Sequence, residues 1–128
     1  MQALLDTNAF LFWATNDLKL SPVARNLISN RQNEIFFSIV SAWEIVIKTQ
    51  ISKLSLPESP EIYIPSRVSY YGFTPLSITM KDVLQIWHLE THHNDLFDCL
   101  LIAQAIVKKL PIITADSKFS LYDVTVIW

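Results

Sequence analysis

Two acidic residues lie three positions apart, at Asp95 and Asp98, directly before a long apolar segment. From Leu100 onward apolar residues predominate up to position 107, which predicts a largely buried helix with Asp98 in its first turn. Because a helix N-terminus carries free N–H groups and a partial positive charge, a carboxylate is stable there. An aspartate in this position either caps the helix or contributes to an acidic site.

Three further acids follow or lie within predicted elements elsewhere in the chain. Asp6 ends the apolar run 2–5, which predicts a buried strand, and Asp116 follows a second apolar run at 110–114. Glu44 lies within a helical pattern that begins at Ser38. In a parallel sheet, ligand sites lie beyond the C-terminal ends of the strands. We therefore hypothesise that Asp6, Glu44, Asp98 and Asp116 converge at one edge of the sheet.

Four carboxylates in one cleft repel one another, and a divalent cation removes that cost. Ligation by oxygen alone favours Mg²⁺ or Mn²⁺ over zinc. Such a cation can hold a phosphodiester oxygen and help activate a water for in-line attack. Each acid also has a local alternative: Asp6 as a helix cap, Glu44 as a solvated helix residue and Asp116 as a turn residue.

The remaining polar residues suggest fewer sites. His88, His92 and His93 raise the possibility of zinc, but neighbouring histidines do not share a helix face and the chain has no set of cysteines. We expect His93 to support the loop before the predicted helix. Lys48 and Lys81 are candidates for phosphate contacts, and their alternative is as ordinary solvated lysines. The tryptophans are expected in the core or at an interface.

Length and composition limit the possible classes of protein. The 128 residues suit one domain spanning 1–128, and a net charge of −2 provides no global positive field for nucleic acid. The single cysteine, Cys99, fits a reducing compartment and is expected as a small core residue. We expect a cytoplasmic protein without a signal peptide or membrane span. Gly72 is the only glycine, which excludes a glycine-rich phosphate loop.

The hydrophobic patterns alternate between strand and helix along the chain. Strands are predicted at 2–5, 34–37, 73–76, 110–114 and 124–128, and helices at 9–14, 22–29, 38–51, 61–71, 79–89 and 98–109. A turn or short helix is predicted at 117–122. The expected fold class is therefore α/β: a single domain with a short parallel sheet of about five strands and helices on both faces.

Four short motifs occur in an order that resembles a known family. They are Leu4-Leu5-Asp6-Thr7-Asn8, Ser41-Ala42-Trp43-Glu44-Ile45, His93 to Asp98 running into Leu101-Ile102-Ala103-Gln104-Ala105, and Thr114-Ala115-Asp116. Together they resemble the motifs of PIN-domain ribonucleases, and most of all the VapC-type toxins of bacterial toxin–antitoxin pairs. The resemblance covers essentially the whole chain, from the first strand to the closing residues 126–128.

The resemblance implies a site and partners. It implies a Mg²⁺ or Mn²⁺ site formed by Asp6, Glu44, Asp98 and Asp116, supported by Asn8, Asp95 and Thr114. It also implies endonucleolytic cleavage of single-stranded RNA, a homodimer and inhibition by a VapB-like antitoxin.

The chain departs from the family pattern at three positions. Leu96 and Glu90 stand where proline is expected, and Cys99 stands where arginine is expected. The loss of that arginine removes a cation near the acids and bears on substrate grip or dimer contacts. Two other functions stay open: a PIN-like module that binds protein or RNA without catalysis, and a phosphatase with Asp6 as nucleophile. Asn8 stands where such phosphatases often carry a second acid, which disfavours that function.

Overall fold

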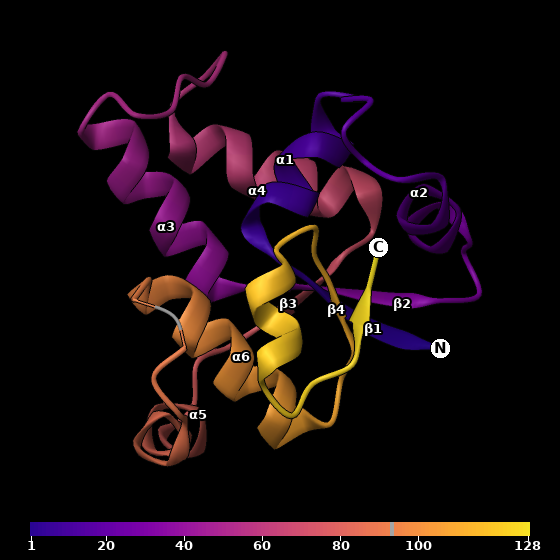
Figure 1. Cartoon of the computed structure of the whole chain (residues 1–128). Coiled ribbons are helices and arrows are strands. Elements are labelled where there is room, and N and C mark those ends of the chain that lie inside the picture. The colour runs from indigo at the N-terminus through magenta and orange to yellow at the C-terminus, as the bar shows by residue number, and fades with distance from the viewer. Residues whose placement is uncertain (93) are drawn as a thin grey trace.

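One parallel β-sheet runs through the middle of the molecule, as a computed structural model describing residues 1–92 and 94–128 shows (Figure 1). The strands are arranged in the order β3-β2-β1-β4-β5. Their bounds are β1 Gln2–Leu5, β2 Glu34–Ser38, β3 Thr74–Leu76, β4 Ile112–Ile113 and β5 Val126–Ile127. All four pairings are parallel, so the C-terminal ends of all five strands lie at one edge.

Helices cover both faces of this sheet. In the view of Figure 1, α1, α2 and α4 lie above the strands, and α5 and α6 lie below them. The helices are α1 Thr7–Ala14, α2 Pro22–Ser29, α3 Ile39–Gln50, α4 Pro60–Tyr71, α5 Met80–Gln85 and α6 Leu96–Lys108, with short 3-10 helices η1 Ile86–His88 and η2 Ser117–Leu121. The predicted fold class is therefore confirmed.

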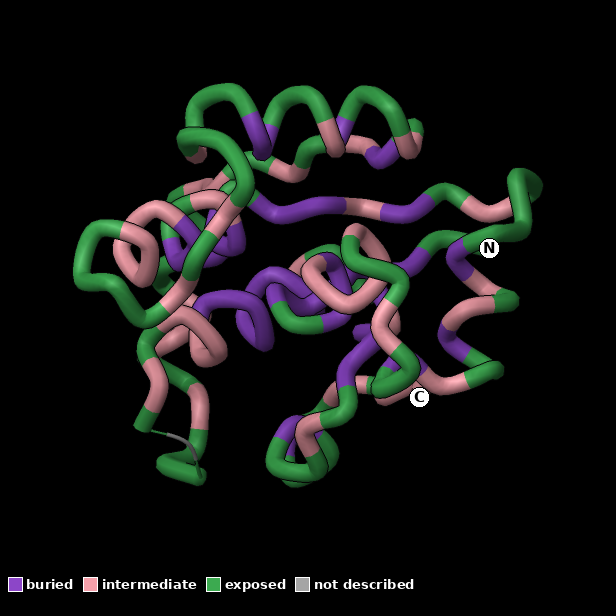
Figure 2. Tube along the Cα trace, turned by 90° about the horizontal axis from the view of Figure 1, so that it is seen from above, coloured by how far each residue is buried: buried purple, intermediate pink, exposed green. Residues whose placement is uncertain are grey.

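Two hydrophobic cores lie on opposite faces of the sheet. On β1, Ala3 and Leu5 face the core formed with α1, α2 and α4, whereas Leu4 faces the core formed with α6. Burial on both faces explains why β1 is an uninterrupted apolar run. Figure 2 shows buried residues along the central strands and inner helix faces, with exposed residues on the outer turns.

Local signals set most helix boundaries. Ser21 and Ser38 cap α2 and α3, and Thr79 forms a capping box with Asp82 at the start of α5. Gly72 ends α4 with φ at 70°, a left-handed conformation that glycine adopts without strain.

Three expectations differ from the structure. The helix predicted from Asp98 begins at Leu96, because the Asp95 side chain accepts hydrogen bonds from the N–H groups of the first turn. The helix predicted over 79–89 is α5 followed by η1. Cys99 is only partly buried, so the expectation of a core residue is wrong. His93, expected to support the neighbouring loop, lies outside the described residues. None of the described helices has the length and apolarity needed to cross a membrane.

Candidate acidic site

Asp6 lies where β1 ends and α1 begins, at the C-terminal edge of the sheet. It is 5% exposed. One carboxylate oxygen accepts a hydrogen bond from the Ala9 N–H at 2.7 Å, and the other accepts from the Thr114 hydroxyl at 2.6 Å. The capping alternative is therefore correct for Asp6, but the cap engages only one of its two oxygens. Capping and membership of an acidic site are compatible.

Burial raises the pKa of Asp6 to about 6, because the charged form is poorly solvated inside the protein. The hydrogen bonds from Thr114 and Ala9 favour the charged form and oppose this rise. The negative charges of Glu44 and Asp116 raise the pKa of Asp6 further, so both acids lie close enough to act on it. Near neutral pH, Asp6 is thus an anion held at an energetic cost.

Thr114 connects Asp6 to Asp116. Its hydroxyl donates to Asp6 and accepts a hydrogen bond from the Asp116 N–H at 3.0 Å. Strands β1 and β4 are neighbours, with Leu5 beside Ile113, so the residues that follow them meet at the same edge. Asp116 also caps η2 by accepting a hydrogen bond from the Lys118 N–H. The predicted alternative of a turn residue is therefore also correct for Asp116. The parallel register is what brings these two distant acids together.

Glu44 reaches the same edge from α3. The alternative of a solvated helix residue is wrong, because Glu44 is 4% exposed. One of its carboxylate oxygens accepts a hydrogen bond from Thr7 at 2.6 Å, and the other pairs with the Lys48 ammonium group. The Ser41 and Thr7 hydroxyl oxygens lie 2.9 Å apart. Since Thr7 directly follows Asp6, this contact ties α3 to the end of β1.

The first turn of α6 completes the neighbourhood. Trp43 on α3 packs edge-on against Phe97 on α6, with ring centroids 4.8 Å apart. Burial works to lower the pKa of Lys48, but its hydrogen bond to Glu44 and the charges of Glu44, Asp95 and Asp98 outweigh burial and raise it. The Asp95 side chain accepts hydrogen bonds from the N–H groups of Phe97 and Asp98. Asp95 and Asp98 therefore lie close enough to Lys48 for their negative charges to act on it.

The structure therefore brings Asp6, Glu44 and Asp116 close enough to interact at this edge of the sheet. It places Asp98 near Lys48, which pairs with Glu44. A site formed by all four acids stays a prediction. Among residues 1–92 and 94–128, no three His, Cys, Asp or Glu side chains are grouped closely enough to enclose a metal ion. Magnesium usually retains several waters and binds proteins through one or two carboxylates, so such a group is not required. The all-oxygen donor set and the uncompensated charge at Asp6 fit a hard divalent cation.

Two predicted residues lie outside these contacts. Asn8 is exposed in the first turn of α1, and Lys81 is exposed on α5 beside Leu84 and His88. Their supporting and phosphate-binding roles stay predictions. Of the histidines, His92 pairs with Glu90 near the surface.

Sequence reasoning missed several buried polar residues. Thr7 contacts Glu44, and Ser41 contacts Thr7. The available signals were that Thr7 directly follows Asp6 and that Ser41 lies within one turn of Glu44. A second hydrogen-bond network joins β2 to α6, where Ser38 donates to Gln104 and Gln104 donates to the Ser77 carbonyl at 3.2 Å. Gln104 is also 3.4 Å from the fully buried Asp82. A lone polar residue within the apolar run of α6 could have revealed it.

Comparison with known proteins gives the family context. The PIN domain family model matches residues 3–124 of this chain. The curated Ribonuclease VapC16 of Mycobacterium tuberculosis is 39% identical over 54 residues, which is 42% of this chain. That alignment spans 38% of the length of the relative.

Solved structures share the fold over nearly the full length. VapBC2 from Rickettsia felis, bound to a DNA fragment from the promoter, has a TM-score of 0.71 at 19% identity and covers 99% of this chain and 98% of its own. DNA-bound VapBC from Salmonella typhimurium has a TM-score of 0.71 at 15% identity, covering 99% and 97%. VapBC-5 from Mycobacterium tuberculosis has a TM-score of 0.63 at 17% identity, covering 98% and 97%. These identities support the shared fold alone.

Proposed function

Because this chain belongs to the PIN domain family, we propose that it is a divalent-cation-dependent endoribonuclease that hydrolyses phosphodiester bonds of single-stranded RNA. The observation that carries the proposal is the buried Asp6, whose charge is opposed by Glu44 and Asp116 at the C-terminal edge of the sheet. A module that only binds a partner has no need to gather repelling charges. An enzyme that neutralises them with a cation does.

Asp6 and Asp98 would be the main ligands of Mg²⁺ or Mn²⁺, with Glu44 and Asp116 completing the site directly or through water. When bound, the cation would supply charge stabilisation and water activation. The chain's own residues orient the ligands. Thr114 fixes one oxygen of Asp6, and Thr7 fixes one oxygen of Glu44. Asp95 holds the first turn of α6, which carries Asp98.

The biological role proposed is that of the toxin in a VapBC-type pair. The similarity to Ribonuclease VapC16 and to the toxin–antitoxin complexes supports it. The partner would be a VapB-like antitoxin in the cytoplasm. Inducing the chain alone in a bacterial host should stop growth, and coexpression of its antitoxin should restore it. Normal growth with abundant soluble chain would argue against a toxin.

A homodimer is also part of the proposal, and an exposed apolar stripe supports it. Met80, Val83, Leu84 and Trp87 recur at helical spacing on α5 and η1, and all four are exposed, Trp87 by 87%. A monomer that leaves such a stripe in water gains nothing from these large side chains. A second copy would cover them.

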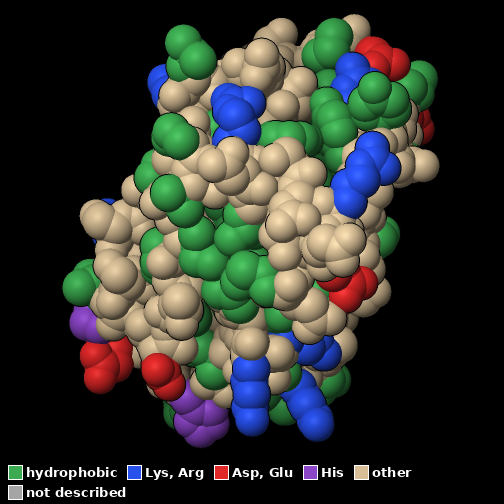
Figure 3. All heavy atoms as spheres, turned by 90° about the vertical axis from the view of Figure 1, so that its right-hand side faces the viewer, with side chains coloured by type: hydrophobic (Ala, Val, Ile, Leu, Met, Phe, Trp, Pro, Cys, Tyr) green, Lys and Arg blue, Asp and Glu red, His purple; other side chains and the backbone are tan. Residues whose placement is uncertain are grey.

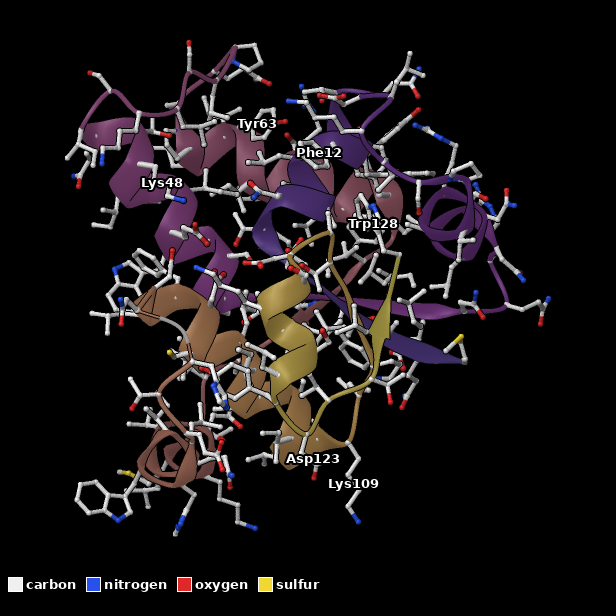
Figure 4. The ribbon with its side chains drawn as sticks, in the orientation of Figure 1. Phe12, Lys48, Tyr63, Lys109, Asp123 and Trp128 are labelled. Carbon is white, nitrogen blue, oxygen red and sulfur yellow. The ribbon has the colours of Figure 1, made fainter. Side chains whose placement is uncertain are left out.

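The experiment that tests the proposed activity is single-turnover cleavage of a panel of single-stranded RNAs with Mg²⁺ or Mn²⁺. Wild type should cleave, and Asp98→Asn should lose at least about a hundredfold in rate, because the cation loses a charged ligand. Asp123→Asn is the matched control, since Figure 4 shows Asp123 at the end of the molecule away from Lys48. If wild type leaves every RNA intact, a non-catalytic binding module becomes the better proposal.

A further inference from the structure

Lys48 is a cation placed within an acidic neighbourhood. It lies in the last turn of α3 (Figure 4). Its ammonium group pairs with Glu44, one turn earlier in the helix. The Glu44 side chain is 5% exposed and that of Lys48 is 38% exposed. The pair is therefore anchored at its buried acidic end and open to solvent at its basic end. An ordinary surface pair has two solvated members, and this one does not.

The position of Lys48 is held by more than one element. Thr7 occupies one oxygen of Glu44, so the other oxygen is directed to the ammonium group. The Trp43–Phe97 contact brings the start of α6, with Asp95 and Asp98, alongside α3. An ammonium group has three donors, and the pair with Glu44 needs only one. Lys48 can thus keep its anchor and still donate to a second anion.

Binding of the proposed RNA substrate requires a positive group near the acids. RNA is a polyanion, the chain has a net charge of −2, and the site is acidic. On the face drawn in Figure 3, Lys and Arg side chains form small separate groups around a central apolar region. That face, which lies on the side of the molecule away from Lys48 in Figure 4, offers no continuous basic stripe. A positive group fixed beside the acids would contact the phosphate backbone of the RNA at the point where the RNA approaches the acids.

We infer that Lys48 is a substrate-binding residue of the acidic site: its ammonium group, anchored by Glu44, contacts a phosphate oxygen of the RNA strand. The inference rests on the proposed function and deepens it. It also gives Glu44 a second task, which is to hold this cation. A lysine acts here as a compact point charge, which suits a single phosphate oxygen.

RNA binding without cleavage tests this contact. In the Asp98→Asn background with Mg²⁺, the Kd of a labelled single-stranded RNA is measured by fluorescence anisotropy between about 50 and 200 mM KCl. Adding Lys48→Met should weaken binding by about tenfold and reduce the slope of log Kd against log salt by about 0.7, the value for one lost phosphate contact. Adding Lys109→Met instead is the matched control, because that lysine is exposed and Figure 4 shows it at the end of the molecule away from Lys48. Equal slopes for the two variants overturn the inference.

Lys48→Met also leaves Glu44 buried without its cation, which can disturb the fold. Glu44→Gln is therefore compared with Glu44→Gln/Lys48→Met, where no buried charge is left unpaired. The slope should still fall by about 0.7 in the double variant, and an unchanged slope contradicts the contact.

Cleavage kinetics add an independent readout. In the otherwise wild-type chain, Lys48→Met should raise KM more than it lowers kcat, and Lys48→Arg should recover most of the binding. An unchanged KM in Lys48→Met overturns the inference while leaving the proposed activity intact. Absence of cleavage by wild type overturns the proposed activity, and the anisotropy measurement still decides whether Lys48 binds RNA.

Discussion

Replacing Asp6 by asparagine should stabilise the metal-free protein at neutral and mildly alkaline pH. Burial raises the pKa of Asp6 from 3.8 to about 6, and each pKa unit corresponds to 1.36 kcal/mol. The charged carboxylate therefore costs about 3 kcal/mol relative to the protonated one. Asparagine carries no charge, can accept from the Ala9 N–H and can donate to the Thr114 hydroxyl oxygen. We expect a gain of about 1 to 3 kcal/mol in unfolding free energy, less than the full cost because the new hydrogen bonds are uncharged.

The gain must depend on pH in one direction. The pKa of Asp6 is higher in the folded chain than in the unfolded chain, so the folded chain binds this proton more tightly. The resulting stability is fully present below about pH 4 and is lost as pH rises through about 6. Asp6→Asn has no such proton. Its advantage over wild type should be near its minimum at about pH 4 and reach its full size by about pH 7.

Urea unfolding in EDTA, followed by circular dichroism across this pH range, measures the effect. Asp123→Asn serves as control, because Asp123 is exposed and its variant should follow wild type at every pH. If the unfolding free energies of Asp6→Asn and wild type stay parallel from about pH 4 to pH 8, the reasoning about the buried charge is refuted. The reasoning is also refuted if the unfolding free energy of Asp6→Asn falls as pH rises while that of wild type does not.

Four further outcomes are expected. Mg²⁺ should raise the Tm of wild type because it binds the folded protein, and it should raise the Tm of Asp6→Asn less. Differential scanning fluorimetry measures both shifts. Thr114→Val should lower the unfolding free energy by about 1 to 3 kcal/mol, because the buried Asp6 loses a donor; urea titration checks this. Gln104→Leu should lower the unfolding free energy by a similar amount, because the fully buried Asp82 loses a hydrogen bond. Gln104→Glu should not restore the lost stability. Leu84→Asp should convert the proposed dimer to a monomer in light scattering coupled to gel filtration, with the circular dichroism spectrum unchanged.

Local sequence signals predicted most of the framework. Ser21 before a proline, Ser38 before an apolar helix and Thr79 before an acid each mark a helix start, because their side chains satisfy N–H groups that the helix leaves open. The uninterrupted apolar run of β1 predicted a strand buried on both faces. The end of the loop before α6 was misplaced, because either Asp95 or Asp98 could serve as the cap from sequence alone.

The positions of the candidate acids could be read from the sequence, but their surroundings could not. The sequence favoured a solvated Glu44 when that residue was considered alone, whereas the structure buries it against Thr7 and Lys48. The Gln104 network was missed for the same reason. Hydrogen bonds between residues that are 37 or 66 positions apart leave no periodic trace in the chain.

By itself, the sequence determined which segments become strands and helices and that acids stand at the ends of two strands, because these properties depend on neighbours within a few residues. Only the tertiary structure decided that Asp6 carries a costly charge and that Lys48 faces Glu44. Solvation and electrostatic interaction depend on burial and distance in space, and both are set when β1, α3 and α6 pack together.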